Sequence, residues 1–256
     1  MPAVALICCL LALLGPTGAT AAERLEATYE LLWGGLEIGR FETRLRADEA
    51  TYRLAYGART TSFLAWLFPF TALGASEGVI GDPGPVPTRY RGESRRRAGR
   101  STWTVEFGPD GDAIRIEVKV PEDEQRDPVP PALQAAPDPL ALALRATRAA
   151  APGARFEEVS FDGKRAVRVE LVCAEREHPV ALEFEAVSIA QALACSVDGE
   201  VAAGASRRWQ SARDADRAPA TVLLSREIVP GRYWPVRAEA ETRFGRVIAR
   251  LTGFVR

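Results

Sequence analysis

Hydrophobic and polar positions alternate along most of this chain, which is the pattern of a β-strand with one buried face. From Leu25 to Trp33 every second residue is hydrophobic, and the residues between them are mostly polar. Gly34-Gly35 then supplies the positive φ angles that a two-residue hairpin needs, and a return strand begins at Leu36. The alternation shifts by one position at Gly39, which predicts a β-bulge there.

Similar alternating segments continue to the end of the chain. They predict strands at 52–59, 75–80, 88–92, 101–108, 113–120, 156–162, 165–174, 180–187, 192–197, 200–204, 220–229, 233–243 and 246–255. Asp162-Gly163, Asp198-Gly199 and Pro230-Gly231 have the turn chemistry of tight hairpins. The sequence therefore predicts an all-β fold, in which a long antiparallel meander curls into a barrel or half-barrel to protect its edges.

One segment has the features of a helix. Asp138 is suited to the N-cap, Pro139 to the first turn, and hydrophobic residues follow to about Ala151. Pro152-Gly153 then ends the segment. We expect this to be the main helix of the fold.

A second segment, FLAWLFPF at 63–70, is hydrophobic throughout, and no charged residue occurs from Thr60 to Ser76. Its helical spacing predicts a short helix or helical turn that ends at Pro69, which cannot donate to the helix. Its large hydrophobic residues are Phe63, Leu64, Trp66, Leu67, Phe68 and Phe70. We expect Trp66 and Phe70, and Phe63 with them, to point into the concave side of the sheet. The segment could serve as core, as the lid of a cavity or as a membrane contact.

Residues 1–22 have the pattern of a cleaved secretory signal peptide. Ala5 to Leu14 is hydrophobic but too short to cross a bilayer, and Ala19-Thr20-Ala21 has the spacing of a cleavage site. We therefore expect export to the periplasm, with residues 23–256 as a single domain. No later segment is long and apolar enough to span a membrane.

Two cysteines, Cys173 and Cys195, remain after cleavage. In an oxidising compartment an even pair favours a disulfide, and the alternative is two separate buried thiols.

The chain lacks the residues that most catalytic and metal-binding sites need. His178 is the only histidine, which excludes a Ser-His-Asp triad and histidine-rich metal sites, and no phosphate-binding glycine loop is present. Carboxylate pairs such as Glu183 with Glu185 and Glu239 with Glu241 fit the solvated face of a strand. We predict a protein that is not an enzyme and that has no metal site or cofactor.

A basic run extends from Arg89 to Arg100 and contains six arginines. The formal net charge of −1 and the predicted export argue against nucleic acid as a partner. The run fits a solvated hairpin loop, or a contact with an anionic lipid or polysaccharide of the envelope through Arg95, Arg96, Arg97 and Arg100.

Several motifs together resemble one family. They are YELLWGGLEIGRFETRL near the start, FLAWLFPF, SEGVI before a strand with Pro87 and Tyr90, and DPLALALRA at the start of the helix. In this order they resemble the exported bacterial proteins grouped as domain of unknown function 3108, from about Tyr29 to Val255. That family has no established activity, so the resemblance implies no catalytic residues. By looser fold analogy, a curved sheet with a helix in its concavity resembles the periplasmic carriers of lipoproteins.

Two hypotheses follow. In the first, the protein binds or carries a lipid or another hydrophobic ligand, with 63–70 as the lid and Trp33, Phe41, Trp103 and Phe107 as wall residues. In the second, it is a structural or assembly factor that contacts envelope proteins or polysaccharide. An apolar cleft of at least ~300 Å³ would favour the carrier, and a filled core would favour the assembly factor.

Overall fold

The computed structural model describes residues 23–82, 84–121, 126–184, 187–205, 219–242 and 245–256. The predicted signal peptide lies outside these residues. Over the described part of the chain, fourteen strands form one antiparallel sheet whose strand order is β7-β6-β5-β4-β3-β2-β1-β14-β13-β12-β11-β9-β8, with β10 paired to β11. The all-β prediction is confirmed.

The first seven strands follow one another as a simple meander. They are β1 (Glu23–Trp33), β2 (Leu36–Ala47), β3 (Thr51–Thr60), β4 (Phe70–Ile80), β5 (Pro85–Arg96), β6 (Gly99–Phe107) and β7 (Ala113–Lys119). Leu31 pairs with Gly39 and Leu32 with Glu37, so Ile38 is the extra residue of a bulge beside Gly39, as the shift in alternation predicted.

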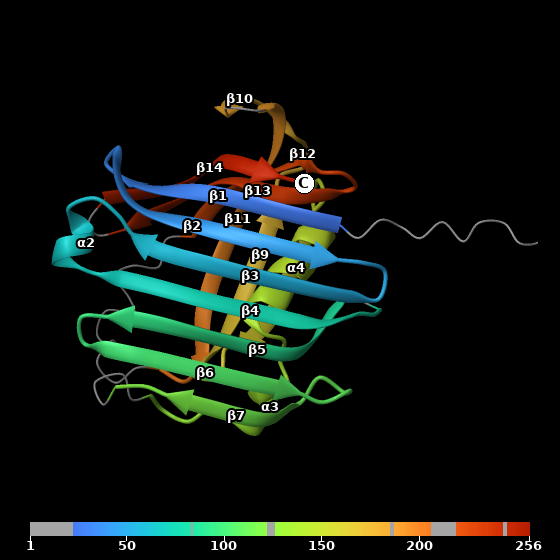
Figure 1. Ribbon diagram of the computed structural model, residues 1–256. Helices are drawn as coiled ribbons and strands as arrows, with labels where there is room; N and C mark the ends of the chain where they lie inside the picture. Colours follow the sequence, from blue (N-terminus) through green and yellow to red (C-terminus); the bar gives the residue numbers. More distant parts are fainter. Residues whose placement is uncertain (1–22, 83, 122–125, 185–186, 206–218, 243–244) are drawn as a thin grey trace, which may run out of the picture.

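The other strands form a second meander. They are β8 (Arg155–Phe161), β9 (Ala166–Cys173), β10 (His178–Phe184), β11 (Val187–Ala203), β12 (Ala220–Val229), β13 (Arg232–Thr242) and β14 (Gly245–Val255). The pairing of β1 with β14 joins the two meanders into one curved sheet, and β7 and β8 are its edges. In Figure 1 the first meander forms the front wall, while β9 and β11 cross steeply behind it.

The helix α4 (Pro139–Ala149) lies in the concavity, where it contacts β3, β4 and β5 of one wall and β8 and β13 of the other (Figure 1). Asp138 is its N-cap, as predicted, and accepts hydrogen bonds from the backbone N–H groups of Leu140 and Ala141. Two shorter helices, α2 (Leu64–Leu67) and α3 (Pro131–Gln134), lie in connections.

The turn predicted at Asp198-Gly199 does not form. The two residues pair with Glu170 and Val169 of β9, inside the single long strand β11. An uninterrupted ladder with β9 provides more backbone hydrogen bonds than a local turn, so the pairing overrides the turn preference of these residues.

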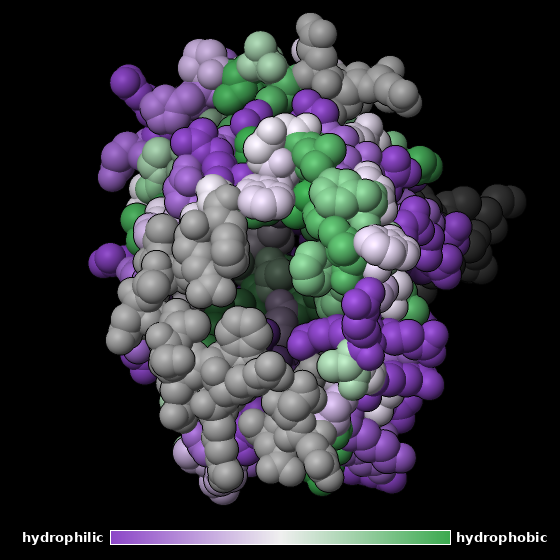
Figure 2. All heavy atoms as spheres, turned by 90° about the vertical axis from the view of Figure 1, so that its left-hand side faces the viewer, coloured by the Kyte–Doolittle hydropathy of each residue, from purple (hydrophilic) through white to green (hydrophobic). Residues whose placement is uncertain are grey.

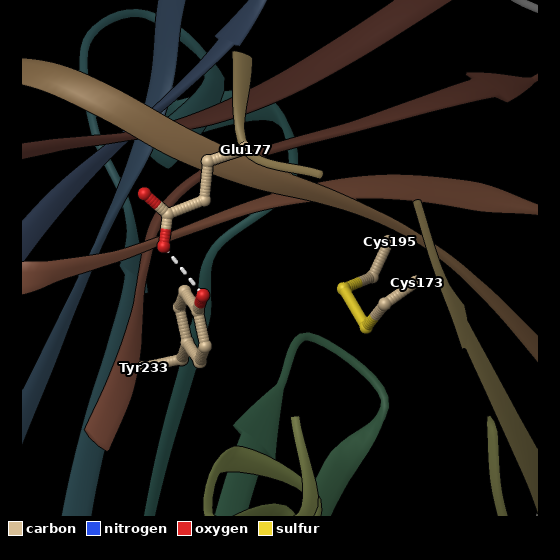
Figure 3. The surroundings of a disulfide bond; sticks show 4 residues. All are labelled: Cys173, Glu177, Cys195 and Tyr233. Carbon is tan, nitrogen blue, oxygen red and sulfur yellow. Dashed lines mark hydrogen bonds between the residues drawn. A yellow bond between two sulfur atoms is a disulfide. The ribbon is translucent and has the colours of Figure 1, made fainter. Parts of the chain in front are cut away.

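The predicted disulfide is confirmed. Cys173 of β9 and Cys195 of β11 are directly paired in the sheet and bonded to each other (Figure 3). Both lie in a buried cluster with Tyr233 of β13. The hydroxyl of Tyr233 donates to Glu177 in the loop between β9 and β10, at 2.5 Å. The disulfide therefore joins the neighbouring strands β9 and β11. Beside it, Tyr233 links β13 to Glu177 in the loop that follows β9.

Candidate ligand-binding cavity

A cavity of about 240 Å³ lies between α4 and the concave face of the sheet. Leu140, Ala143, Leu144 and Thr147 of α4 form one side of the cavity. The other side comes from β1, β2, β13 and β14, the strands on either side of the junction between the two meanders.

Aromatic rings form much of the sheet side of the cavity. Tyr29 and Phe41 lie opposite each other on β1 and β2, with their ring centroids 5.9 Å apart, and Trp234 of β13 adds a third ring. On the helix side Ala143 is exposed, because its small side chain does not reach across the space in front of it. The cavity therefore exists where a short helix side chain faces a wall of large rings.

The polar atoms around the cavity mostly have partners within the protein. The hydroxyl of Tyr29 donates to the carbonyl oxygen of Pro235 and accepts from Nε1 of Trp234, both at 2.9 Å. Burial raises the pKa of Tyr29, so this hydroxyl stays neutral. The hydroxyl of Thr147 donates to the carbonyl oxygen of Leu144. The exception is Oγ1 of Thr43, which is buried without a hydrogen-bond partner.

Small residues continue the concave face from the cavity towards one end of the strands. Gly39, Ala58 and Ala72 occupy this region, next to the cavity residue Phe41 in the strand register. Figure 2 looks onto this end of the molecule, on the left of Figure 1, and shows a hollow with hydrophobic side chains inside it.

Two other cavities are less suited to an apolar ligand. One, of about 340 Å³, combines Ile116 and Val118 with the charged residues Arg126, Asp127 and Lys164. The other, of about 450 Å³, is a groove among exposed residues such as Arg44, Leu73 and Arg91. The cavity beside α4 is smaller than either of them and falls short of the ~300 Å³ that would favour a carrier of a drug-sized molecule. It suits a slender chain or a single ring.

The predicted wall residues divide into three environments. Phe41 lines the cavity. Trp103 and Phe107 instead belong to a separate buried cluster with Tyr90 and Val105. Trp33, at the end of β1, is partly exposed and does not line the cavity.

The segment 63–70 also differs from prediction. It forms the short helix α2, but Phe70 is the first residue of β4 instead of part of the helix. Trp66 is 78% exposed, Phe68 68% and Phe63 54%, so the expected inward orientation of Trp66 and Phe63 is wrong. Leu67 is also exposed, whereas Leu64 and Phe70 are half-buried. A connection between two neighbouring strands at the end of the sheet has little above it to pack against, so its hydrophobic residues remain on the surface.

The predicted basic residues lie in the hairpin between β5 and β6, at the same end of the sheet as α2 (Figure 1). Arg97 donates from Nη2 to the carbonyl oxygen of Trp66 at 3.0 Å. The guanidinium of Arg96 lies over the ring of Phe70, 5.9 Å from its centroid. Arg95 and Arg100 both approach the carboxylate of Glu93.

A buried polar chain fixes the start of α4. Ser76 of β4 donates to Oδ2 of Asp138 at 2.7 Å, and its hydroxyl lies 2.9 Å from that of Tyr52 on β3. Asp138 is fully buried, and burial raises its pKa from 3.8 to about 6, against the lowering effect of the Ser76 and backbone hydrogen bonds. These contacts hold the helix, and with it the cavity wall, against the first meander.

The family profile described as "Protein of unknown function (DUF3108)" matches residues 28–252. The chain belongs to this family. The match covers the strands around the cavity, the helix α4, the segment α2 and both cysteines of the DUF3108 chain. No curated protein matches the sequence.

The fold of this DUF3108 chain is similar to a crystal structure described as a beta-barrel-like protein of domain of unknown function DUF1849 from Brucella abortus. The TM-score is 0.52 and the sequence identity 10%, and the match covers 91% of this chain and 97% of the other. At this identity the likeness concerns the fold alone.

Within the ranges that the structure describes, this DUF3108 chain has no helix long and apolar enough to cross a membrane. Among the same residues, no group of three or more histidine, cysteine, aspartate or glutamate side chains is placed to hold a metal ion.

Proposed function

We propose that this DUF3108 protein binds a hydrophobic molecule, such as a lipid, without converting it chemically, and that it does so in the periplasm after export. The observation that carries the proposal is the cavity beside α4, which is lined mainly by apolar side chains, with Arg237 as its one charged residue; Thr43, also in the lining, has a buried Oγ1 without a hydrogen-bond partner.

The shape of the cavity favours an apolar chain as the bound group. Each methylene that leaves water for an apolar site contributes roughly 0.8 kcal/mol, and association costs several kcal/mol of translational and rotational freedom. A chain that fills about 240 Å³ therefore binds with moderate affinity, which suits a carrier that must release its cargo. A single hydroxyl, ester or carboxyl group on the ligand would pair with Thr43 after a rotation of its side chain, because Oγ1 lies buried.

The disulfide supports the proposed compartment. A bond between Cys173 and Cys195 persists in an oxidising environment, and the signal-like pattern of residues 1–22 points to the same environment.

A structural or assembly factor is the second candidate, and one observation favours it. Large hydrophobic residues such as Trp66 and Phe68 are exposed at one end of the sheet, where they could contact a protein or polysaccharide of the envelope. This function needs no ligand in the cavity.

A titration with the fluorescent probe 1-N-phenylnaphthylamine separates the two candidates. Ala143→Phe places a ring in the cavity from an exposed helix position, and Ala149→Phe places the same ring on an exposed part of α4 outside it. We expect the wild type and Ala149→Phe to bind the probe with equal affinity, and Ala143→Phe to lose at least tenfold. Equal binding by all three proteins, or no binding by any, would contradict a ligand site in this cavity.

A second variant tests the polar atom. Thr43→Val removes the unpartnered hydroxyl and keeps the shape of the side chain, so stability should not fall. We expect lauric acid to bind this variant more weakly than the wild type, while dodecane binds both proteins equally.

A further inference from the structure

Exposed hydrophobic residues from two separate parts of the chain meet at one end of the sheet. Trp33 and Leu36 flank the hairpin between β1 and β2, and α2 follows the end of β3. The two segments are linked, because Thr61 donates from its backbone N–H to the carbonyl oxygen of Ile38 at 3.1 Å. Together they form an apolar rim, defined here as Trp33, Leu36, Phe63, Trp66, Leu67 and Phe68.

The basic hairpin adjoins this apolar rim. The contact between Arg97 and the carbonyl oxygen of Trp66 holds the tip of the β5–β6 hairpin against α2. From Glu93 to Arg100 the hairpin has four arginines and one glutamate, a formal charge of +3. In Figure 2, hydrophobic residues gather on the right of the hollow and hydrophilic residues lie directly below them.

We propose that this end of the protein docks on the surface of an anionic lipid bilayer. Tryptophan and phenylalanine side chains favour the boundary between head groups and acyl chains, and neighbouring arginines favour anionic head groups. Trp66 and Phe68 enter the interface, and the arginines of the hairpin contact the phosphate groups around them. The proposal is separate from ligand binding by the cavity, although docking in this orientation turns the hollow towards the membrane.

Charge favours a bilayer over a second copy of the chain as the occupant of this surface. The segment from Thr60 to Ser76 has no charged residue. The nearby carboxylate of Glu37 already accepts from Thr61 and pairs with Arg40, so α2 offers no unengaged carboxylate to an approaching arginine hairpin. In a two-fold dimer through this face, each copy would bring the same four arginines into the contact. An anionic membrane instead supplies opposite charge next to an apolar layer, which matches both parts of the surface.

Vesicle flotation tests the proposal with phosphatidylcholine alone and with phosphatidylcholine and phosphatidylglycerol at a ratio of 7:3. We expect the wild type to float with the anionic vesicles and much less with the neutral ones, and 0.5 M NaCl to weaken the binding. The double variant Trp66→Ala/Phe68→Ala should lose binding roughly tenfold or more, since both side chains are removed from the interface. Its control is Ile114→Ala, an equally exposed hydrophobic residue on β7.

The charged part of the surface is tested by Arg95→Gln/Arg97→Gln, with Arg115→Gln on β7 as the control. We expect the double variant to lose the preference for anionic vesicles and the control to keep it. In vesicles of brominated lipid, tryptophan fluorescence of the wild type should be quenched more strongly than that of Trp66→Phe. Binding that is absent in the wild type, or that is unchanged in both double variants, would overturn the proposal. A dimer that Trp66→Ala/Phe68→Ala dissociates, without vesicle binding, would assign this face to a second copy instead.

Discussion

Replacing Asp138 by asparagine should make the protein less sensitive to pH. The asparagine Oδ1 can still accept hydrogen bonds from the backbone N–H groups of Leu140 and Ala141, so the cap of α4 is kept. Its amide can face Ser76, whose hydroxyl is able to rotate. The change therefore removes a titratable group from the interior and leaves the packing in place.

The magnitude follows from the raised pKa of Asp138. The folded protein binds the proton more tightly than the unfolded chain, because the pKa is about 6 in the fold and 3.8 ordinarily. The stabilisation is therefore fully present below the unfolded pKa and is lost as the pH rises through the folded one. The total loss is about 3 kcal/mol, of which about 2 kcal/mol falls between pH 4.5 and 7.5.

Urea unfolding of the wild type and Asp138→Asn at pH 4.5 and 7.5 measures this effect. We expect the free energy of unfolding of the wild type, relative to the variant, to fall by about 2 kcal/mol from the lower to the higher pH. Asp48→Asn gives a control for which no such change is expected. The pKa of the exposed Asp48 is lowered from its ordinary 3.8 by hydrogen bonds from the backbone N–H groups of Thr51 and Ala50, so its contribution is already complete at pH 4.5 and stays nearly constant up to pH 7.5. If the difference in free energy of unfolding between the wild type and Asp138→Asn stays constant across this pH range, the carboxyl group of Asp138 does not have a raised pKa in the folded protein.

Three further outcomes are expected. Alkylation without reductant should label neither Cys173 nor Cys195. Reduction should lower the free energy of unfolding by about 3 kcal/mol, since the bond joins residues 22 apart in sequence. Rapid labelling of both thiols in the native protein would be inconsistent with the bond. Trp66→Ala should leave the free energy of unfolding within about 0.5 kcal/mol of the wild type, because the side chain is exposed; a large loss would place it in the core. Trp103→Ala should cost ~3–5 kcal/mol in the same measurement, because its ring is buried in the cluster with Tyr90 and Phe107. A small loss would mean that this cluster is loosely packed.

The regular parts of the fold were predictable because they depend on local patterns. Alternation along β1 and β2 located a hairpin and its bulge, and the spacing of Asp138 and Pro139 located the start of the main helix. The disulfide followed from the count of cysteines and the expected compartment.

The cavity was less predictable, because it depends on which inner residues face each other across the fold. Phe41 was identified as a wall residue, but its partners Tyr29 and Trp234 are far apart in the chain and meet through the pairing of β1 with β14 and of β14 with β13. Ala143 matters because of the space that its side chain leaves, which a search for large hydrophobic residues does not detect. The prediction that Trp66 points into the concave side was wrong, because hydrophobicity alone does not distinguish a core residue from an exposed one.

Native mass spectrometry of the protein purified from its own envelope tests the central claim most directly, since a retained lipid or other hydrophobic molecule adds a defined mass. We predict such an adduct on the wild type and on Ala149→Phe, and its loss from Ala143→Phe, whose added ring fills the cavity beside α4. An adduct that persists on Ala143→Phe, or a wild type that carries no bound molecule, would contradict a carrier function for this cavity.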